Sequence, residues 1–235
     1  MTMALGIGVG LPFGVSTRRL PYQDQLLWWL DPRRITATPV DSWPARVGTF
    51  SPTAAGGARP TWSGTDVDFD GTDDALTMAA SAATSPVGAS KFTLGFWANA
   101  DSVAAIAVVL ETSGYPNSIM ALSAATYIDM FVGSLSCRFP TAMTVGSWAF
   151  YAMTFDGSRA LNSRGRLFRG EPTVVEVSPS ADNINVTTVP VVAGNAGIGG
   201  RSTVYFDGKI GDAFLWSGVE LTAAELQQVV NATNY

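Results

Sequence analysis

Carboxylate side chains gather in one short part of the sequence and are its clearest candidates for chemistry. They stand at Asp66, Asp68, Asp70, Asp73 and Asp74. Calcium prefers sites where loops supply several hard oxygen ligands. The alternative is that Asp70 forms an Asx-type turn and that Asp73 or Asp74 accepts hydrogen bonds from nearby backbone amides.

A second segment, at Asp207, has a similar sequence and the same two possible roles. The candidate calcium ligands are Asp70, Asp73, Asp74 and Asp207. No other cofactor is predicted.

Histidine is absent from the sequence, and Cys137 is the only cysteine. Catalysis by Ser-His-Asp or Cys-His arrangements and metal binding by imidazole are therefore excluded. A lone cysteine also rules out an internal disulfide and a zinc cluster. We predict no catalytic residue on these grounds.

Two aromatic side chains are candidate glycan contacts, because an exposed ring can stack on a sugar. Tyr115 lies in a turn-like sequence at residues 113–117. Trp97 follows Phe96 in a strand-like run, so its ring faces away from Phe92 and Phe96. Core packing is the alternative for Trp97, since both faces of a sandwich strand can be covered.

Short apolar runs with turn residues between them predict the strands that must position these side chains. Phe-Asp-Gly occurs at residues 69–71, 155–157 and 206–208, and Asp-Gly suits a tight turn. Many regular strands of this kind indicate an antiparallel sandwich. The strand-like runs are residues 74–80, 91–98, 105–111, 117–123, 126–132, 134–139, 147–155, 165–169, 173–177, 189–193, 203–207 and 209–216.

One helix is predicted near the end of the sequence, at residues 222–231. Thr222 and Glu225 have the spacing of a capping box, and Leu221 and Leu226 that of a hydrophobic staple. We expect this helix to lie over the edge of the sandwich and to be structural.

Six segments, in order, resemble the concanavalin A-like lectin/glucanase superfamily, specifically its laminin-G-like branch. This resemblance implies an all-β, antiparallel two-sheet jelly-roll sandwich with one short C-terminal helix. It also implies that one calcium ion can bind at a rim. The segments are Leu27–Asp31 with Arg59–Trp62, Phe69–Leu76, Phe92–Trp97, Gly146–Gly157, Gly165–Glu171 and Gly208–Val230.

Glycanases of this superfamily carry a Glu-x-Asp-x-x-Glu strand that presents two carboxylates on one face, as sugar hydrolysis requires. The sequence has no such run, and its glutamates are isolated at Glu111, Glu171, Glu176, Glu220 and Glu225. We therefore expect a protein that is not an enzyme.

The amino-acid composition indicates which classes of partner can be expected. Charged residues make up 14% of the sequence, the formal net charge is −5 and the pI is near 4.6. No basic stripe is present to neutralise phosphates, so nucleic acid is not an expected partner. The apolar, glycine-rich start is too short to span a bilayer, and its arginines follow the apolar run, unlike a secretory signal.

We interpret residues 1–24 as an N-terminal docking arm and residues 25–235 as the laminin-G-like sandwich. An extended arm would present alternate apolar side chains to a partner. These partner-docking residues are Leu5, Ile7, Val9, Leu11 and Phe13.

The arm, the low charge and the resemblance, which extends to structural proteins of tailed phages, favour a structural protein of a virus particle. This protein would be a capsid decoration or tail-associated component that displays a lectin-like sandwich, with a role in host adhesion. Its partners would be other virion proteins and host surface glycans, and we expect a homo-oligomer or a larger assembly. The alternative is a bacterial surface or secreted carbohydrate-binding module.

Overall fold

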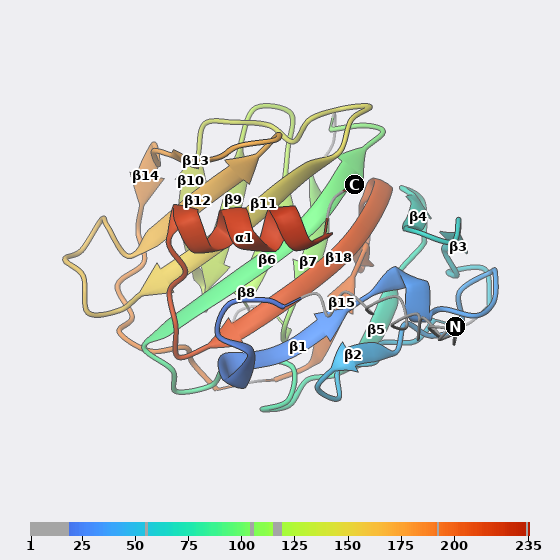
Figure 1. Cartoon of the computed structure of the whole chain (residues 1–235), viewed down its shortest axis with the longest axis horizontal. Coiled ribbons are helices and arrows are strands. Elements are labelled where there is room, and N and C mark those ends of the chain that lie inside the picture. Colours follow the sequence, from blue (N-terminus) through green and yellow to red (C-terminus); the bar gives the residue numbers. More distant parts are fainter. Residues whose placement is uncertain (1–18, 55, 104–105, 115–118, 192, 234) are drawn as a thin grey trace, which may run out of the picture.

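Two antiparallel sheets packed face to face form the body of the molecule, and one helix lies outside them (Figure 1). The computed structural model describes residues 19–54, 56–103, 106–114, 119–191, 193–233 and 235. Among these residues no helix has both the length and the apolar character needed to cross a bilayer. The five proposed docking residues of the arm and Tyr115 lie outside the described residues.

The first sheet has nine strands. Seven follow the order β13-β12-β11-β6-β18-β1-β2, while β4 pairs with β18 and β3 pairs with β4. The strands are β1 (Leu26–Leu30), β2 (Ala45–Val47), β3 (Thr61–Trp62), β4 (Val67–Asp70), β6 (Lys91–Ala100), β11 (Ala149–Asp156), β12 (Gly165–Gly170), β13 (Val174–Val177) and β18 (Asp207–Ser217).

The second sheet has seven strands in the order β14-β10-β9-β8-β7-β15-β5. They are β5 (Leu76–Ala79), β7 (Ala107–Glu111), β8 (Ile119–Ser123), β9 (Ile128–Val132), β10 (Leu135–Phe139), β14 (Ala181–Asp182) and β15 (Asn195–Ile198). A separate hairpin is made by β16 (Gly200–Arg201) and β17 (Val204–Tyr205). Two short 3-10 helices, at Gln23–Gln25 and Pro32–Arg34, flank β1.

This architecture confirms the predicted all-β antiparallel sandwich with one short helix near its end. Two local predictions are wrong. Residues 189–191 and 193 form no strand, because Val189 instead exchanges backbone hydrogen bonds with Gly88 and Ala89 in a neighbouring loop. The third Asp-Gly pair is not a turn either: Asp207 begins β18, and Gly208 pairs with Phe69 on one side and Ala100 on the other.

The central strands of the first sheet bury both of their faces. All eight residues of β11 are buried. On the inner face Phe155 stacks on Phe92 of β6, with ring centroids 5.4 Å apart. On the outer face Phe150 packs against Trp97, with centroids 5.6 Å apart. An outer face this apolar needs a cover of its own, in addition to the second sheet.

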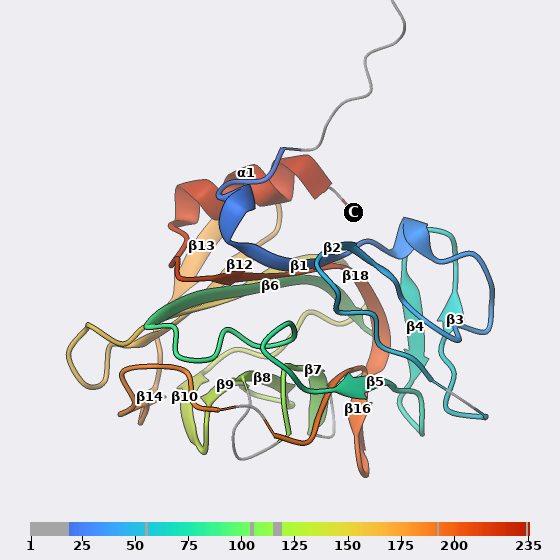
Figure 2. The ribbon, with the colours of Figure 1, turned by 90° about the horizontal axis from the view of Figure 1, so that it is seen from below.

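Helix α1 (Ala223–Thr233) supplies that cover. Figure 2 shows it lying across the outer side of the first sheet, with the second sheet beneath. The capping box is confirmed: the Glu225 amide donates to Thr222 Oγ1 at 3.4 Å, and the Thr222 amide donates to Glu225 Oε2 at 2.7 Å. The helix lies over the face of the sandwich and not over its edge, because Leu226, Val229 and Val230 pack on the outer apolar cluster of the sheet.

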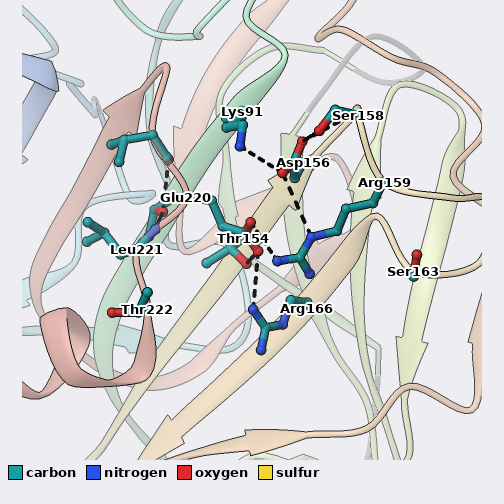
Figure 3. A network of polar contacts seen from close by, with 12 residues as sticks. Lys91, Thr154, Asp156, Ser158, Arg159, Ser163, Arg166, Glu220, Leu221 and Thr222 are labelled. Carbon is teal, nitrogen blue, oxygen red and sulfur yellow. Dashed lines mark hydrogen bonds and ion pairs between the residues drawn. The ribbon is translucent and has the colours of Figure 1, made fainter.

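A polar network fixes the turn that leads into α1 (Figure 3). Glu220 accepts hydrogen bonds from Thr154 of β11 at 3.1 Å and from Arg159 at 2.8 Å. Nearby, Asp156 pairs with Lys91 of β6 at 2.8 Å and accepts a hydrogen bond from the Ser158 hydroxyl at 2.6 Å. Burial alone would raise the pKa of Asp156, but these partners outweigh it and hold the pKa at about 2.

Stability should therefore depend on pH through Asp156. Its folded pKa lies below the ordinary value of 3.8, so its contribution is complete above that value and is lost as the pH falls toward about 2. We expect Asp156→Asn to lower the free energy of unfolding near neutral pH and to flatten its acid dependence. Urea titrations at stepped pH would measure this, with the exposed Asp24→Asn as control. An unchanged acid slope in Asp156→Asn would contradict the assignment.

Candidate functional site

The pairing register of β5, β15 and β7 leaves a cavity at the rim of the second sheet. Gly197 of β15 pairs with Thr77 of β5 on one side and with Glu111 of β7 on the other. Side chains that pair across neighbouring strands project from the same face of a sheet. Because Gly197 has no side chain, the space between Thr77 and Glu111 stays open, as a cavity of about 330 Å³.

The hairpin of β16 and β17 forms the wall of this cavity and of a second one, of about 410 Å³. Glycines allow it to sit close to the sandwich. A Cβ at Gly199 would come within 2.0 Å of the Phe69 ring, and one at Gly200 would lie 3.1 Å from the Asp74 carbonyl oxygen. Gly199 also donates its amide to the Val109 carbonyl at 3.0 Å, which ties the hairpin to β7.

The two cavities share one wall and carry polar groups along it. Both are lined by Thr77, Gly200, Arg201 and Ser202. Glu111 and Asn195 belong to the first cavity, and Asp73 and Tyr205 to the second. Convergent polar side chains beside an aromatic ring, in spaces of this size, are typical of small-ligand sites.

A buried carboxylate and a half-buried guanidinium form an ion pair in the first cavity. Glu111 Oε1 lies 3.2 Å from Arg201 Nη1, and the Glu111 side chain is only 4% exposed whereas that of Arg201 is 37% exposed. Removing either partner would take an opposite charge away from the other, which is costly for the buried Glu111. The pair therefore fixes the position and the charge of this wall.

Three of the four proposed calcium ligands meet at the start of the loop between β4 and β5. Carboxylate oxygens of Asp70, Asp73 and Asp74 all lie within 4.8 Å of one another. Asp70 Oδ1 accepts from the Thr72 amide at 2.8 Å, and Asp74 Oδ2 accepts from the Asp70 amide at 3.0 Å. The hydrogen bonds to backbone amides, which were the alternative to calcium binding, are thus present. Each of these two carboxylates also has a second oxygen that can serve as a metal ligand.

The donor chemistry of this loop fits calcium. Burial raises the pKa of Asp74, and the charges of Asp70 and Asp73 raise it further, so a cation would relieve repulsion here. Asp207 lies opposite Asp70 in the pairing of β18 with β4 but outside the three-carboxylate group. Burial and the charges of Asp101 and Asp70 raise the pKa of Asp207 as well.

Trp97 lies beneath the end of α1. The residue is 5% exposed, and its indole N–H donates to Thr233 Oγ1 at 2.8 Å. It contributes to a cavity of about 290 Å³ with Trp148 and Tyr235, away from the rim of the second sheet. The core role considered for Trp97 is therefore the one that the structure displays.

Sequence reasoning missed Thr77, Asn195, Arg201 and Tyr205, and treated Glu111 only as an isolated glutamate. The paired glycines before Arg201 were a usable signal, because adjacent glycines mark a close approach of the backbone. The row of Thr77, Gly197 and Glu111 had no such signal, since it depends on the pairing of strands far apart in sequence.

Solved structures of other proteins share this fold. A Trypanosoma rangeli sialidase bound to sialic acid matches with a TM-score of 0.61 at 11% identity, over 88% of this chain and 33% of the sialidase. Botulinum neurotoxin type C, whose cell entry depends on two ganglioside molecules, matches with a TM-score of 0.58 at 12% identity, over 90% and 52%. A heptameric SAP-like pentraxin from Limulus polyphemus matches with a TM-score of 0.51 at 13% identity, over 75% and 84%.

The expectation that the chain is not an enzyme is overturned by these comparisons, because sialidases contain this fold over about a third of their length. The missing histidine and the missing glycanase strand were therefore insufficient grounds for excluding activity. The chain spans about a third of the length of the sialidases. At 10–12% identity the likeness shows a shared fold and assigns no reaction to this chain.

The sequence itself places the chain in a family. No curated protein sequence matches it. A family model described as the concanavalin A-like lectin/glucanases superfamily matches residues 69–227, from the end of β4 into α1. This match covers more than half of the sequence and includes every strand of the second sheet and most strands of the first, so the chain belongs to the concanavalin A-like lectin/glucanases superfamily, as a laminin-G-like member.

Proposed function

We propose that the chain binds carbohydrate in the two cavities that flank the hairpin of β16 and β17. The observation that carries this proposal is the shared polar wall, in which Thr77, Arg201 and Ser202 serve both cavities. Hydroxyl, amide and charged groups can pair with sugar hydroxyls, while the Tyr205 ring offers an apolar surface for a sugar face. Two adjoining cavities suit neighbouring units of an oligosaccharide.

The comparisons support this proposal at the level of the fold. One similar structure is a sialidase in complex with sialic acid, and another belongs to a toxin that depends on gangliosides for cell entry. Both proteins act on or through glycans and contain a sandwich like this one. The location of the binding site comes from the cavities of this chain and not from those proteins.

The setting that we propose is a virus particle. The chain would be a capsid decoration or tail-associated protein, held by residues 1–24 to other virion proteins as one of several copies, with the sandwich displayed toward host glycans. The support is the alternation of apolar residues and glycines in the arm, together with the low fraction of charged residues. A bacterial surface or secreted carbohydrate-binding module is the second candidate, and the same cavities would serve it.

Carbohydrate binding should depend on the Tyr205 ring. A glycan array followed by titration of the ligands found would identify the sugars. We expect Tyr205→Ala to weaken their binding by about tenfold or more, as loss of one stacked ring commonly does. Tyr127→Ala is the matched control, since that ring stacks under Arg138 on another part of the second sheet. Equal effects of the two substitutions, or an array without ligands, would contradict the proposed site.

Calcium should bind at Asp70, Asp73 and Asp74. Asp73 is the best residue to test, because its exposed side chain can lose its charge at little cost to the fold. Calorimetry should detect saturable calcium binding that Asp73→Asn weakens about tenfold or more, since calcium affinity follows the number of charged ligands. Asp41→Asn, which removes an exposed carboxylate paired with Arg59, should have no effect. Failure of the native chain to bind calcium would remove the ion from the proposal.

The arm should be required for assembly and dispensable for folding. Deleting residues 1–15 should leave the circular dichroism spectrum and the melting temperature of the sandwich unchanged, while abolishing incorporation into particles. Mass spectrometry of purified particles would measure the occupancy of both versions. Normal occupancy of the truncated chain would place the anchor elsewhere, and absence of the full chain from particles would favour the surface or secreted module.

A further inference from the structure

The two cavities that flank the hairpin of β16 and β17 are called the rim cavities below. The charges of their lining residues indicate which kind of sugar these cavities accept. The described lining residues include two carboxylates, Asp73 and Glu111, and one guanidinium, Arg201. Their formal balance is one negative charge. The internal positions outside the described residues, at 55, 104–105, 115–118, 192 and 234, hold no charged residue, so they do not alter this balance.

The one cation among the described lining residues is already paired with a carboxylate. Arg201 Nη1 lies 3.2 Å from Glu111 Oε1, and Glu111 is almost fully buried. The other N–H groups of Arg201 can reach a ligand carboxylate, but the guanidinium charge that would attract it is already offset by Glu111. A ligand carboxylate at this place would also lie close to the buried Glu111 charge, and like charges repel strongly in a low-dielectric site.

The surroundings of the second cavity are negative as well. Asp73 lies within 4.8 Å of the Asp70 and Asp74 carboxylates. Arg59, next to the lining residue Ala58, pairs with Asp41 at 2.9 Å. A calcium ion on the three aspartates would bring two positive charges against the two further negative charges of Asp70 and Asp74, so the balance stays at one negative charge.

We infer that the rim cavities select uncharged sugars and discriminate against carboxylated sugars such as sialic acid. This inference rests on the proposed carbohydrate-binding function and narrows its ligand class. It also separates this chain from the sialidase structure of similar fold, which holds sialic acid. Neutral hydroxyl-rich rings can use both members of the Glu111–Arg201 pair as hydrogen-bond partners without separating them.

Matched glycans test the inference directly. Each pair consists of one oligosaccharide with and without a terminal sialic acid, for example 3′-sialyllactose and lactose, titrated against the full chain with and without calcium. We expect the neutral member to bind at least about tenfold more tightly. Equal binding, or preference for the sialylated member, would overturn the inference and leave the proposed function intact. Absence of binding by every neutral and sialylated glycan would overturn both.

Substitution of Glu111 gives a second, positive test. Glu111→Gln removes the charge that neutralises Arg201 and keeps the size of the side chain. We expect the ratio of sialylated to neutral binding to rise by about tenfold, because the charge of Arg201 is then no longer offset by Glu111 and attracts a ligand carboxylate. The control is Asp129→Asn, which removes an equally buried carboxylate from Arg138 in the same sheet. An unchanged ratio in a folded Glu111→Gln variant would contradict the role of the pair.

Salt dependence keeps the inference testable if Glu111→Gln does not fold. Raising the salt concentration from about 0.01 M to about 1 M shortens the Debye length from about 30 Å to about 3 Å. Screening should strengthen the weak binding of sialylated glycans to the native chain and leave the binding of neutral glycans unchanged. Weaker binding of sialylated glycans at high salt would reveal attraction, and would overturn the inference.

Discussion

Burial of both faces of the first sheet is the constraint on which the rest of this structure depends. Strands β6, β11 and β18 are buried at alternate and intervening positions alike over most of their length, so both of their faces must be covered. The second sheet covers one face and α1 covers the other. Both sides of the central strands are thus used for packing, and the loops and the rim of the second sheet are the parts left for binding.

The same constraint explains why polar networks stand at the ends of the long strands. The turn before α1 must hold the helix against the sheet, and Glu220 connects that turn to Thr154 of β11 and to Arg159. A buried acid that accepts several charged or hydroxyl partners restricts the turn to one position more strongly than apolar contacts do. Beside the end of β1, Asp212 of β18 accepts hydrogen bonds from Trp29 and Tyr235, which fixes the approach of β1 and of the last described residue.

Most strands and the helix could be predicted from sequence, because their signals lie within a few neighbouring residues. The candidate site could not, because it depends on residues that are far apart in the sequence. The capping box of Thr222 and Glu225 lies within four residues, and its geometry was predictable because helix starts are governed by adjacent groups. The role of Asp207 was misjudged because an Asp-Gly pair suits both a turn and a strand, and only its neighbours Phe69 and Ala100 decide between them. Glu111 could not be identified for a similar reason, since Gly197 and Arg201 approach it from much later in the sequence.

The Glu111–Arg201 pair is better explained by the shape of the cavity than by the stability of the sheet. Transferring both charges from water costs free energy that their attraction offsets only in part, so apolar residues of similar volume would hold the strand at least as well. At the same place the pair does something that apolar residues cannot do. It presents a donor and an acceptor at fixed positions beside an open space, and the buried carboxylate offsets the charge with which the guanidinium would attract an anionic ligand. A wall that is polar, rigid and already neutralised is suited to a partner rich in hydroxyl groups and without a charge of its own.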